Sequence, residues 1–163
     1  MTVLNAIEQQ MVDGITEHGW FGMHVMPEGD FPGFSYSIGF WESIGAPEFL
    51  IYALPRNLQH SMLWELFRQL KAGRTLTDGG RISDLLEGFD CIVRPVHVSN
   101  FPEQVGSALW YRRHKLGNAD GLNVWQVFWP GSQQELFPWE AGCAQEVRDD
   151  QPLLYLPKET GLA

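Results

Sequence analysis

Two apolar runs joined by a short connection that contains Gly and Pro constrain the fold of this chain most, and together they span residues 31–54. In 34–40, Phe, Tyr, Ile and Phe alternate with Ser, Ser and Gly, a pattern typical of a strand with one buried face. The small residues on its other face allow a second element to approach closely. In 48–54 the apolar run is continuous, as in a strand covered on both faces. The sequence therefore predicts a central pair of strands with a loop at 41–47.

Three amphipathic segments predict helices, because apolar residues recur in them three or four positions apart. They cover residues 2–18, 57–72 and 101–116. Asn57 is expected to be the N-cap of the second helix. Further strands are expected at 89–99, where Pro95 favours an edge strand or a bulge, and in a C-terminal region of strands over 122–156.

These elements predict an α+β fold in a single domain over residues 1–163. The early strands follow one another through short connections, so the sheet is expected to be mostly antiparallel. About three helices are expected to pack against it. Because one face of the central strand is rich in small residues, a curved sheet with barrel-like closure is kept as an option.

The charge of the chain limits the classes of partner that it is expected to bind. Its formal net charge is −9, which disfavours nucleic acids and anionic membrane surfaces. The first residues carry neither a basic segment nor a long apolar run, so no signal peptide and no membrane span are predicted. With two cysteines in the chain, we expect reduced thiols and a cytoplasmic location.

Several motifs together resemble a known family. They are Gly-Trp at the start of 19–25, Phe-Ser-Tyr-Ser-Ile-Gly-Phe at 34–40, Gly-Ala-Pro-Glu at 45–48, Val-Trp-Gln-Val-Phe-Trp-Pro at 124–130, Phe-Pro-Trp-Glu at 137–140 and Gln-Pro-Leu-Leu at 151–154. The chain resembles DUF4262, a bacterial domain family of unknown function, over roughly residues 19–154. Ser37 stands where the family usually has Thr, Ala46 where it has His, and Glu140 where it has Asp. If the family uses that His chemically, Ala46 argues against the same activity here.

Two residues of the central pair are candidates for ligand binding. Glu48 precedes an apolar strand, where partial burial would raise its pKa and suit acid–base chemistry or cation binding. The alternative is that Glu48 holds backbone amides at the turn. Tyr36 lies between Phe34 and Phe40 on the aromatic face, and core packing with the hydroxyl at an edge explains it as simply.

Histidines and tryptophans supply the remaining candidates. His60 lies on the second predicted helix, but no two histidines have the spacing of a helical metal site, so no metal site is predicted. Trp125, Trp129 and Trp139 make the C-terminal region aromatic, which suits a flat ligand such as a flavin. A plain core or a dimer interface explains the same residues.

Two functions from different classes are consistent with these features. The first is a non-enzymatic binding or accessory domain that pairs with another protein or with itself as a homodimer. The second is a flavin- or small-molecule-binding protein, an oxidoreductase among the options, because the central strands resemble those of split-barrel flavin reductases. Fold analogy alone does not fix function. We therefore take the first as the expectation and keep the second as the alternative.

Overall fold

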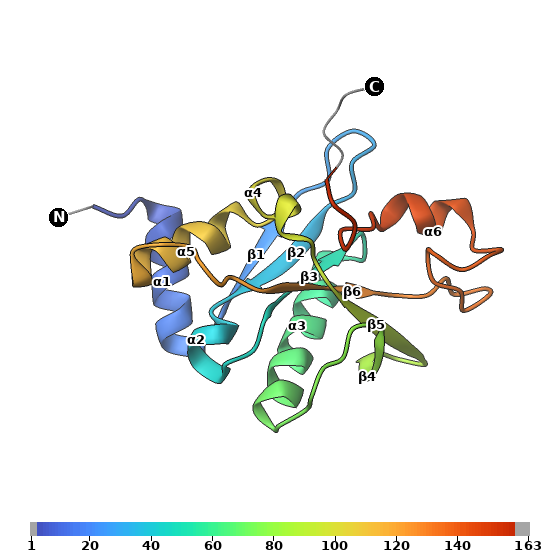
Figure 1. Cartoon of the computed structure of the whole chain (residues 1–163), viewed down its shortest axis with the longest axis horizontal. Coiled ribbons are helices and arrows are strands. Elements are labelled where there is room, and N and C mark those ends of the chain that lie inside the picture. Colours follow the sequence, from blue (N-terminus) through green and yellow to red (C-terminus); the bar gives the residue numbers. More distant parts are fainter. Residues whose placement is uncertain (1–2, 159–163) are drawn as a thin grey trace.

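The computed structural model describes residues 3–158, which form one six-stranded sheet with helices on both faces (Figure 1). The strands are β1 (Phe21–Val25), β2 (Phe34–Ile38), β3 (Glu48–Tyr52), β4 (Gly80–Leu86), β5 (Phe89–Pro95) and β6 (Val124–Phe128). Their order in the sheet is β1-β2-β3-β6-β5-β4. Only the β3–β6 pair is parallel among the strands described. The α+β class and the mostly antiparallel sheet are confirmed, but the sheet stays open and does not close into a barrel.

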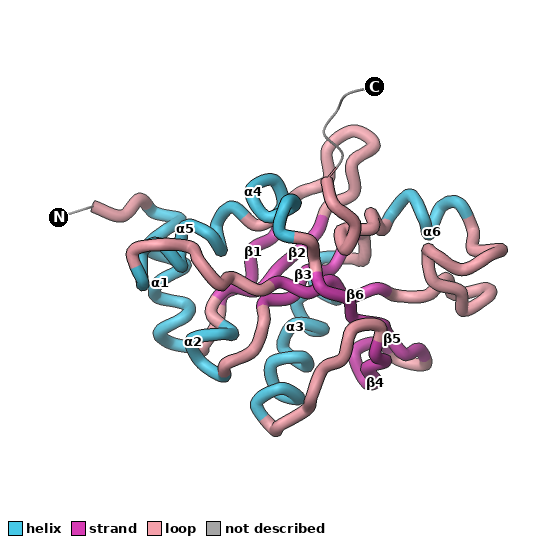
Figure 2. The backbone as a smooth tube through the Cα atoms, viewed as in Figure 1, coloured by secondary structure: helices cyan, strands magenta, loops and turns pink. Residues whose placement is uncertain are grey.

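The described residues contain more helix than the sequence predicts (Figure 2). The helices are α1 (Ala6–His18), α2 (Phe40–Ile44), α3 (Arg56–Lys71), the 3-10 turn η1 (Val98–Asn100), α4 (Phe101–Gln104), α5 (Gly106–Leu116) and α6 (Gln145–Asp150). The single helix predicted over 101–116 is interrupted at Val105, where φ is −130° and ψ is 45°. α2 occupies the segment predicted as a loop, and glycines in the left-handed conformation, Gly39 and Gly45, bound it at both ends.

The two longest helices begin differently, because a local sequence signal defines the start of α1 but not that of α3. α1 begins at Asn5, whose side chain accepts from the Glu8 amide while Glu8 accepts from the Asn5 amide, a complete capping box. The predicted start at residue 2 lies outside the described residues. α3 begins after Pro55, two residues before the predicted cap Asn57, and no side chain caps it. The first amides of α3 are therefore left open to other partners.

The strands predicted over 122–156 reduce to β6, and the chain then continues through turns into α6. The side chain of Gln151 explains why no strand pairs there. Its Oε1 accepts from the Trp129 amide at 2.9 Å and its Nε2 donates to the Trp129 carbonyl at 2.8 Å, so a side chain occupies the place of a strand partner. Pro95 was expected at an edge or a bulge, yet β5 lies between β4 and β6 and Pro95 is its last residue.

Each face of the sheet has its own core (Figure 1). On one face α1, α4 and α5 pack against Tyr36, Ile38, Leu50 and Val124. On the other face α3 packs against Phe49, Ile51 and Val127 through Met62, Leu63 and Leu66. Within the described residues no helix is long and apolar enough to cross a bilayer.

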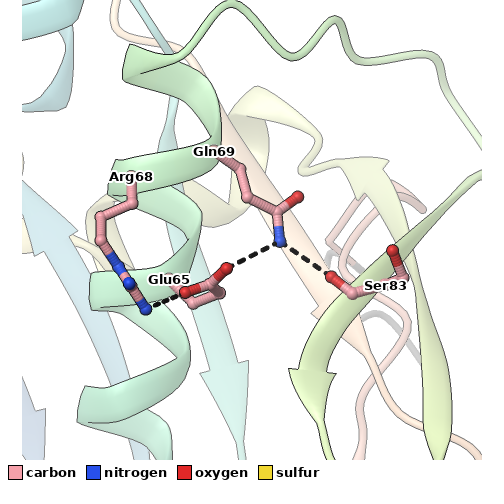
Figure 3. Close-up of polar contacts among 4 residues, drawn as sticks. All are labelled: Glu65, Arg68, Gln69 and Ser83. Atoms are coloured by element: carbon pink, nitrogen blue, oxygen red, sulfur yellow. Dashed lines mark hydrogen bonds and ion pairs between the residues drawn. The ribbon is translucent and has the colours of Figure 1, made fainter.

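Hydrogen bonds hold the C-terminal half of α3 against β4 (Figure 3). The Gln69 amide nitrogen donates to the Ser83 carbonyl at 2.8 Å and to Glu65 at 3.3 Å. Glu65 also pairs with Arg68 on the same helix. The Gln69–Ser83 hydrogen bond thus ties the last turns of α3 to β4, while the Glu65 contacts lie within the helix.

Candidate functional site

A polar pocket lies between the β1–β2 hairpin and the first turn of α3. Ser35 on β2 and Gln59 on α3 are both buried, and the Ser35 hydroxyl donates to Gln59 Oε1. His24 on β1 places Nδ1 2.6 Å from the Ser35 Oγ. A hydroxyl has one proton to give, so His24 must donate from Nδ1 and keep a lone pair on Nε2. The close approach expected at the small face of β2 is therefore made by Gln59.

Burial and nearby positive charge both act on the imidazoles at this pocket. Burial, then the charge of Arg56 and then that of His60 lower the pKa of His24 to about 4. Burial, followed by Arg56, also lowers the pKa of His60. Both imidazoles are therefore neutral at pH 7. Their ring centroids lie 5.5 Å apart, and the buried Nδ1 of His60 has no hydrogen-bond partner among the described residues.

The pocket has a volume of about 300 Å³. One wall is the β1–β2 hairpin, and the opposite wall is the segment from Ala53 to Arg56 that leads into α3. Ala53 has φ of +69°, a left-handed conformation that a residue with a side chain adopts at a cost. This turn leads the chain from the end of β3 to the start of α3, and it brings Arg56 to the pocket wall.

A larger apolar groove adjoins the polar pocket. Its volume is about 620 Å³, and it lies between the start of α3, the β4–β5 turn, the loop after β6, and α6. The apolar side chains that line it include Leu54, Leu58, Phe89, Trp129, Leu136 and Val147. Leu54 and Asp150 line both cavities, so the groove and the pocket share a wall.

Glu48 belongs to a separate and closed network. Its carboxylate accepts from the Ser37 hydroxyl at 2.8 Å and from the amides of Gly39 at 3.1 Å and Phe40 at 3.2 Å. Burial raises its pKa to about 7, against the opposing effect of these hydrogen bonds. Ser37 in turn accepts from the Phe49 amide at 3.0 Å. The network ties the start of α2 to β3, and the carboxyl faces neither of the two cavities described above.

The other residues singled out in the sequence do not converge on one site. Tyr36 is buried, its hydroxyl accepts from the Ser107 amide at 3.2 Å, and burial raises its pKa. Trp129 lines the apolar groove and donates from Nε1 to the Tyr52 carbonyl at 2.8 Å. Trp125 packs in the α3-side core. Trp139 packs against Phe128 and Phe137.

Sequence reasoning missed most of the polar pocket. Ser35, His24 and Gln59 lie on three elements, and no spacing in the sequence links them. His60, which the sequence singled out, lies beside His24 but does not line the polar pocket; it lines a separate cavity between α1, β1 and α3. The apolar pattern of α3 gave no sign that Gln59 is buried, because Gln59 is a polar residue on the buried side of the helix. Within the described residues, no three His, Cys, Asp or Glu side chains cluster as a metal site.

Comparison with known proteins gives a family and nothing finer. No curated protein matches the chain, and no solved structure does. The family model described as "Domain of unknown function (DUF4262)" matches residues 14–144, which is most of the chain. The matched range includes β1 to β6, the polar pocket apart from Asp150, and most of the groove. The chain therefore belongs to the DUF4262 family.

Proposed function

We propose that this chain is a binding domain that holds a small, largely apolar molecule in the groove beside α3 and α6. The groove volume of about 620 Å³ carries the proposal. Ligand pockets usually enclose about 300–1,000 Å³, and mostly apolar walls with a few polar groups are typical of them. Leu58, Trp129 and Val147 provide such walls from three different segments of the chain.

The α6 wall supports an occupant for the groove. α6 has six residues, none of them buried, and no side chain caps its N-terminus. A helix this short gains most of its stability from packing rather than from its own hydrogen bonds. A molecule in the groove would bury Val147 and add the apolar contact that α6 lacks. Burial of apolar surface on both partners would then favour binding.

Binding rather than turnover is favoured by the Ser35–His24 contact. It places a hydroxyl next to an imidazole, as a nucleophile and base would be placed. Ser35 is, however, 0% exposed and its proton is held by Gln59, so a substrate cannot reach the oxygen. The flavin alternative relied on a split barrel and on three tryptophans. With an open sheet, and with Trp129 alone of the three at the groove, it has less support.

Nile red, a neutral apolar dye, tests the proposal directly. We expect its fluorescence to rise on binding to the protein and Val147→Trp, which fills the groove, to weaken that binding about tenfold or more. Val98→Trp is the matched control, because Val98 is 65% exposed on η1 and lines neither cavity. If the two variants bind the dye equally well, the groove is not the binding site and the proposal is wrong.

A further inference from the structure

We infer that the ligand is an amphiphile with a carboxylate head, and that the polar pocket beside the groove binds this head. The inference rests on the proposed function, since it assigns the apolar chain of the same molecule to the groove. Two residues on the pocket wall match a monoanion: Arg56, which is the first residue of the uncapped helix α3, and Gln59, through its side-chain amide.

Arg56 and the start of α3 supply the positive potential. α3 has sixteen residues and begins at Arg56, and its N-cap residue Pro55 makes no side-chain cap, so the first amides are free to bind an anion. Arg56 is exposed, and no carboxylate pairs with it among the described residues. Its charge reaches both His24 and His60, whose pKa values it lowers. Arg56 is the one Lys or Arg residue that lines this pocket among the described residues.

Gln59 is the independent observation that points to a ligand. Its side chain is 3% exposed, and its Oε1 is taken by the Ser35 hydroxyl. Its amide nitrogen has no acceptor among the described residues, although Gln59 lines the pocket. A carboxylate oxygen in the pocket would satisfy this nitrogen.

The acidic group on the shared wall limits the charge of the head. Asp150 lines the same pocket as Arg56, and burial, Glu146 and Asp149 raise its pKa. A second negative charge beside Asp150 would be repelled, whereas a monoanion is balanced by Arg56 and the α3 amides. His24 and His60 are neutral and add no charge at pH 7. A carboxylate therefore fits better than a phosphate dianion.

The shared wall connects the head to the chain of the ligand. Leu54 lines both cavities, and Leu58, in the first turn of α3, lines the groove. A ligand whose carboxylate lies at Arg56 can thus pass over Leu54 and bury its apolar chain between Trp129 and Val147. Neither cavity alone would select such a molecule: the groove recognises its chain, and the pocket recognises its charge.

Calorimetric titration with decanoate and decanol separates the two sites. We expect decanoate to bind about tenfold or more tightly than decanol, because charged hydrogen bonds are the stronger ones. Arg56→Gln should remove this preference and leave decanol binding unchanged. Arg113→Gln, which removes an exposed positive charge from α5, should keep it.

Each other outcome contradicts a different claim. If decanol binds the protein as tightly as decanoate, the groove stands and the carboxylate assignment is wrong. The same holds if Arg56→Gln behaves like Arg113→Gln. If neither probe binds, the groove is not a ligand site, and both the proposed function and this inference fall. Circular dichroism of the two arginine variants checks that a lost preference does not come from misfolding.

Discussion

Two serines on the same strand, Ser35 and Ser37, support polar networks of opposite character. Ser37 joins a closed network, in which Glu48 accepts from the hydroxyl and from two backbone amides. Ser35 joins an open network, in which the Gln59 amide nitrogen and the His24 Nε2 are left without partners among the described residues. Both serines are 0% exposed. The two serines are therefore equally buried, and they differ in whether the groups around them have all their hydrogen-bond partners.

The difference separates groups that hold the fold from groups that are available to a ligand. A fully satisfied buried network stabilises one conformation, and removing one member leaves the others unpaired. An incompletely satisfied network at a cavity wall has donors and acceptors to offer. Glu48 was the carboxylate that the sequence indicated as a candidate, and its surroundings show that it holds the fold. Gln59, which no pattern marked, is of the second kind.

The largest expected effect comes from opening the closed network. Glu48→Ala leaves the Ser37 hydroxyl and the Gly39 and Phe40 amides without an acceptor, so the free energy of unfolding should fall by about 3 kcal/mol. Urea denaturation followed by circular dichroism measures it. Glu17→Ala, on the exposed face of α1, is the control and should change the value little. A loss as small as that of the control would mean that Glu48 does not hold α2 to β3.

The closed network should also respond to pH. The folded-state pKa of Glu48 is about 7 and its ordinary value is 4.5, so the folded protein favours the protonated carboxyl. That contribution to stability is fully present below pH 4.5 and is lost as the pH rises through 7, by about 3 kcal/mol in total. Glu48→Gln cannot titrate. The difference in unfolding free energy between the native protein and this variant should therefore fall across that range, and a constant difference would contradict the assignment.

The open network should tolerate a substitution that keeps its volume. Gln59→Leu removes one hydrogen bond, and the Ser35 hydroxyl can still bond to His24. The free energy of unfolding should therefore fall by only about 1 kcal/mol. Gln69→Leu is the matched control, because it removes the tie from α3 to the Ser83 carbonyl (Figure 3). We expect similar losses of stability from both, and a loss of decanoate affinity from Gln59→Leu alone. If both variants change the affinity for decanoate equally, the carboxylate head does not bind at Gln59.

The smallest expected effect is a change in the titration of His24. Its pKa should be about 4 by NMR, because burial and then the charge of Arg56 disfavour the imidazolium. Arg56→Gln should raise this pKa without restoring the ordinary value of 6.5, since burial is the larger cause. Arg113→Gln should leave it unchanged. If Arg56→Gln leaves the pKa of His24 where it is in the native protein, Arg56 does not give the pocket the positive potential that anion binding requires.

Local patterns in the sequence were sufficient to predict the central strands and the long helices. Alternation in 34–40 predicted β2, and helical periodicity predicted α3. α2 was missed because its five residues are too few to show a period; the left-handed glycines on either side define it. The strands predicted toward residue 156 failed because the Gln151 side chain takes the Trp129 backbone groups that a strand partner would use.

The candidate site was harder to predict than the fold, because it depends on contacts between distant segments. The small face of β2 did indicate a close approach, but nothing in the sequence named Gln59 as the partner. Likewise, the three C-terminal tryptophans are close in sequence, yet Trp125 and Trp139 pack into two different cores while Trp129 faces the groove. Proximity along the chain therefore suggested one aromatic wall where the fold makes three environments.

The most direct test of the account is an NMR titration of labelled protein with decanoate, compared with decanol. We predict that decanoate shifts the Val147 methyl resonances in the groove and the Gln59 side-chain amide in the polar pocket along one binding curve. Decanol should shift Val147 alone. If decanoate shifts only one of the two reporters, or shifts them with different affinities, the groove and the pocket do not hold one ligand and the central claim is wrong.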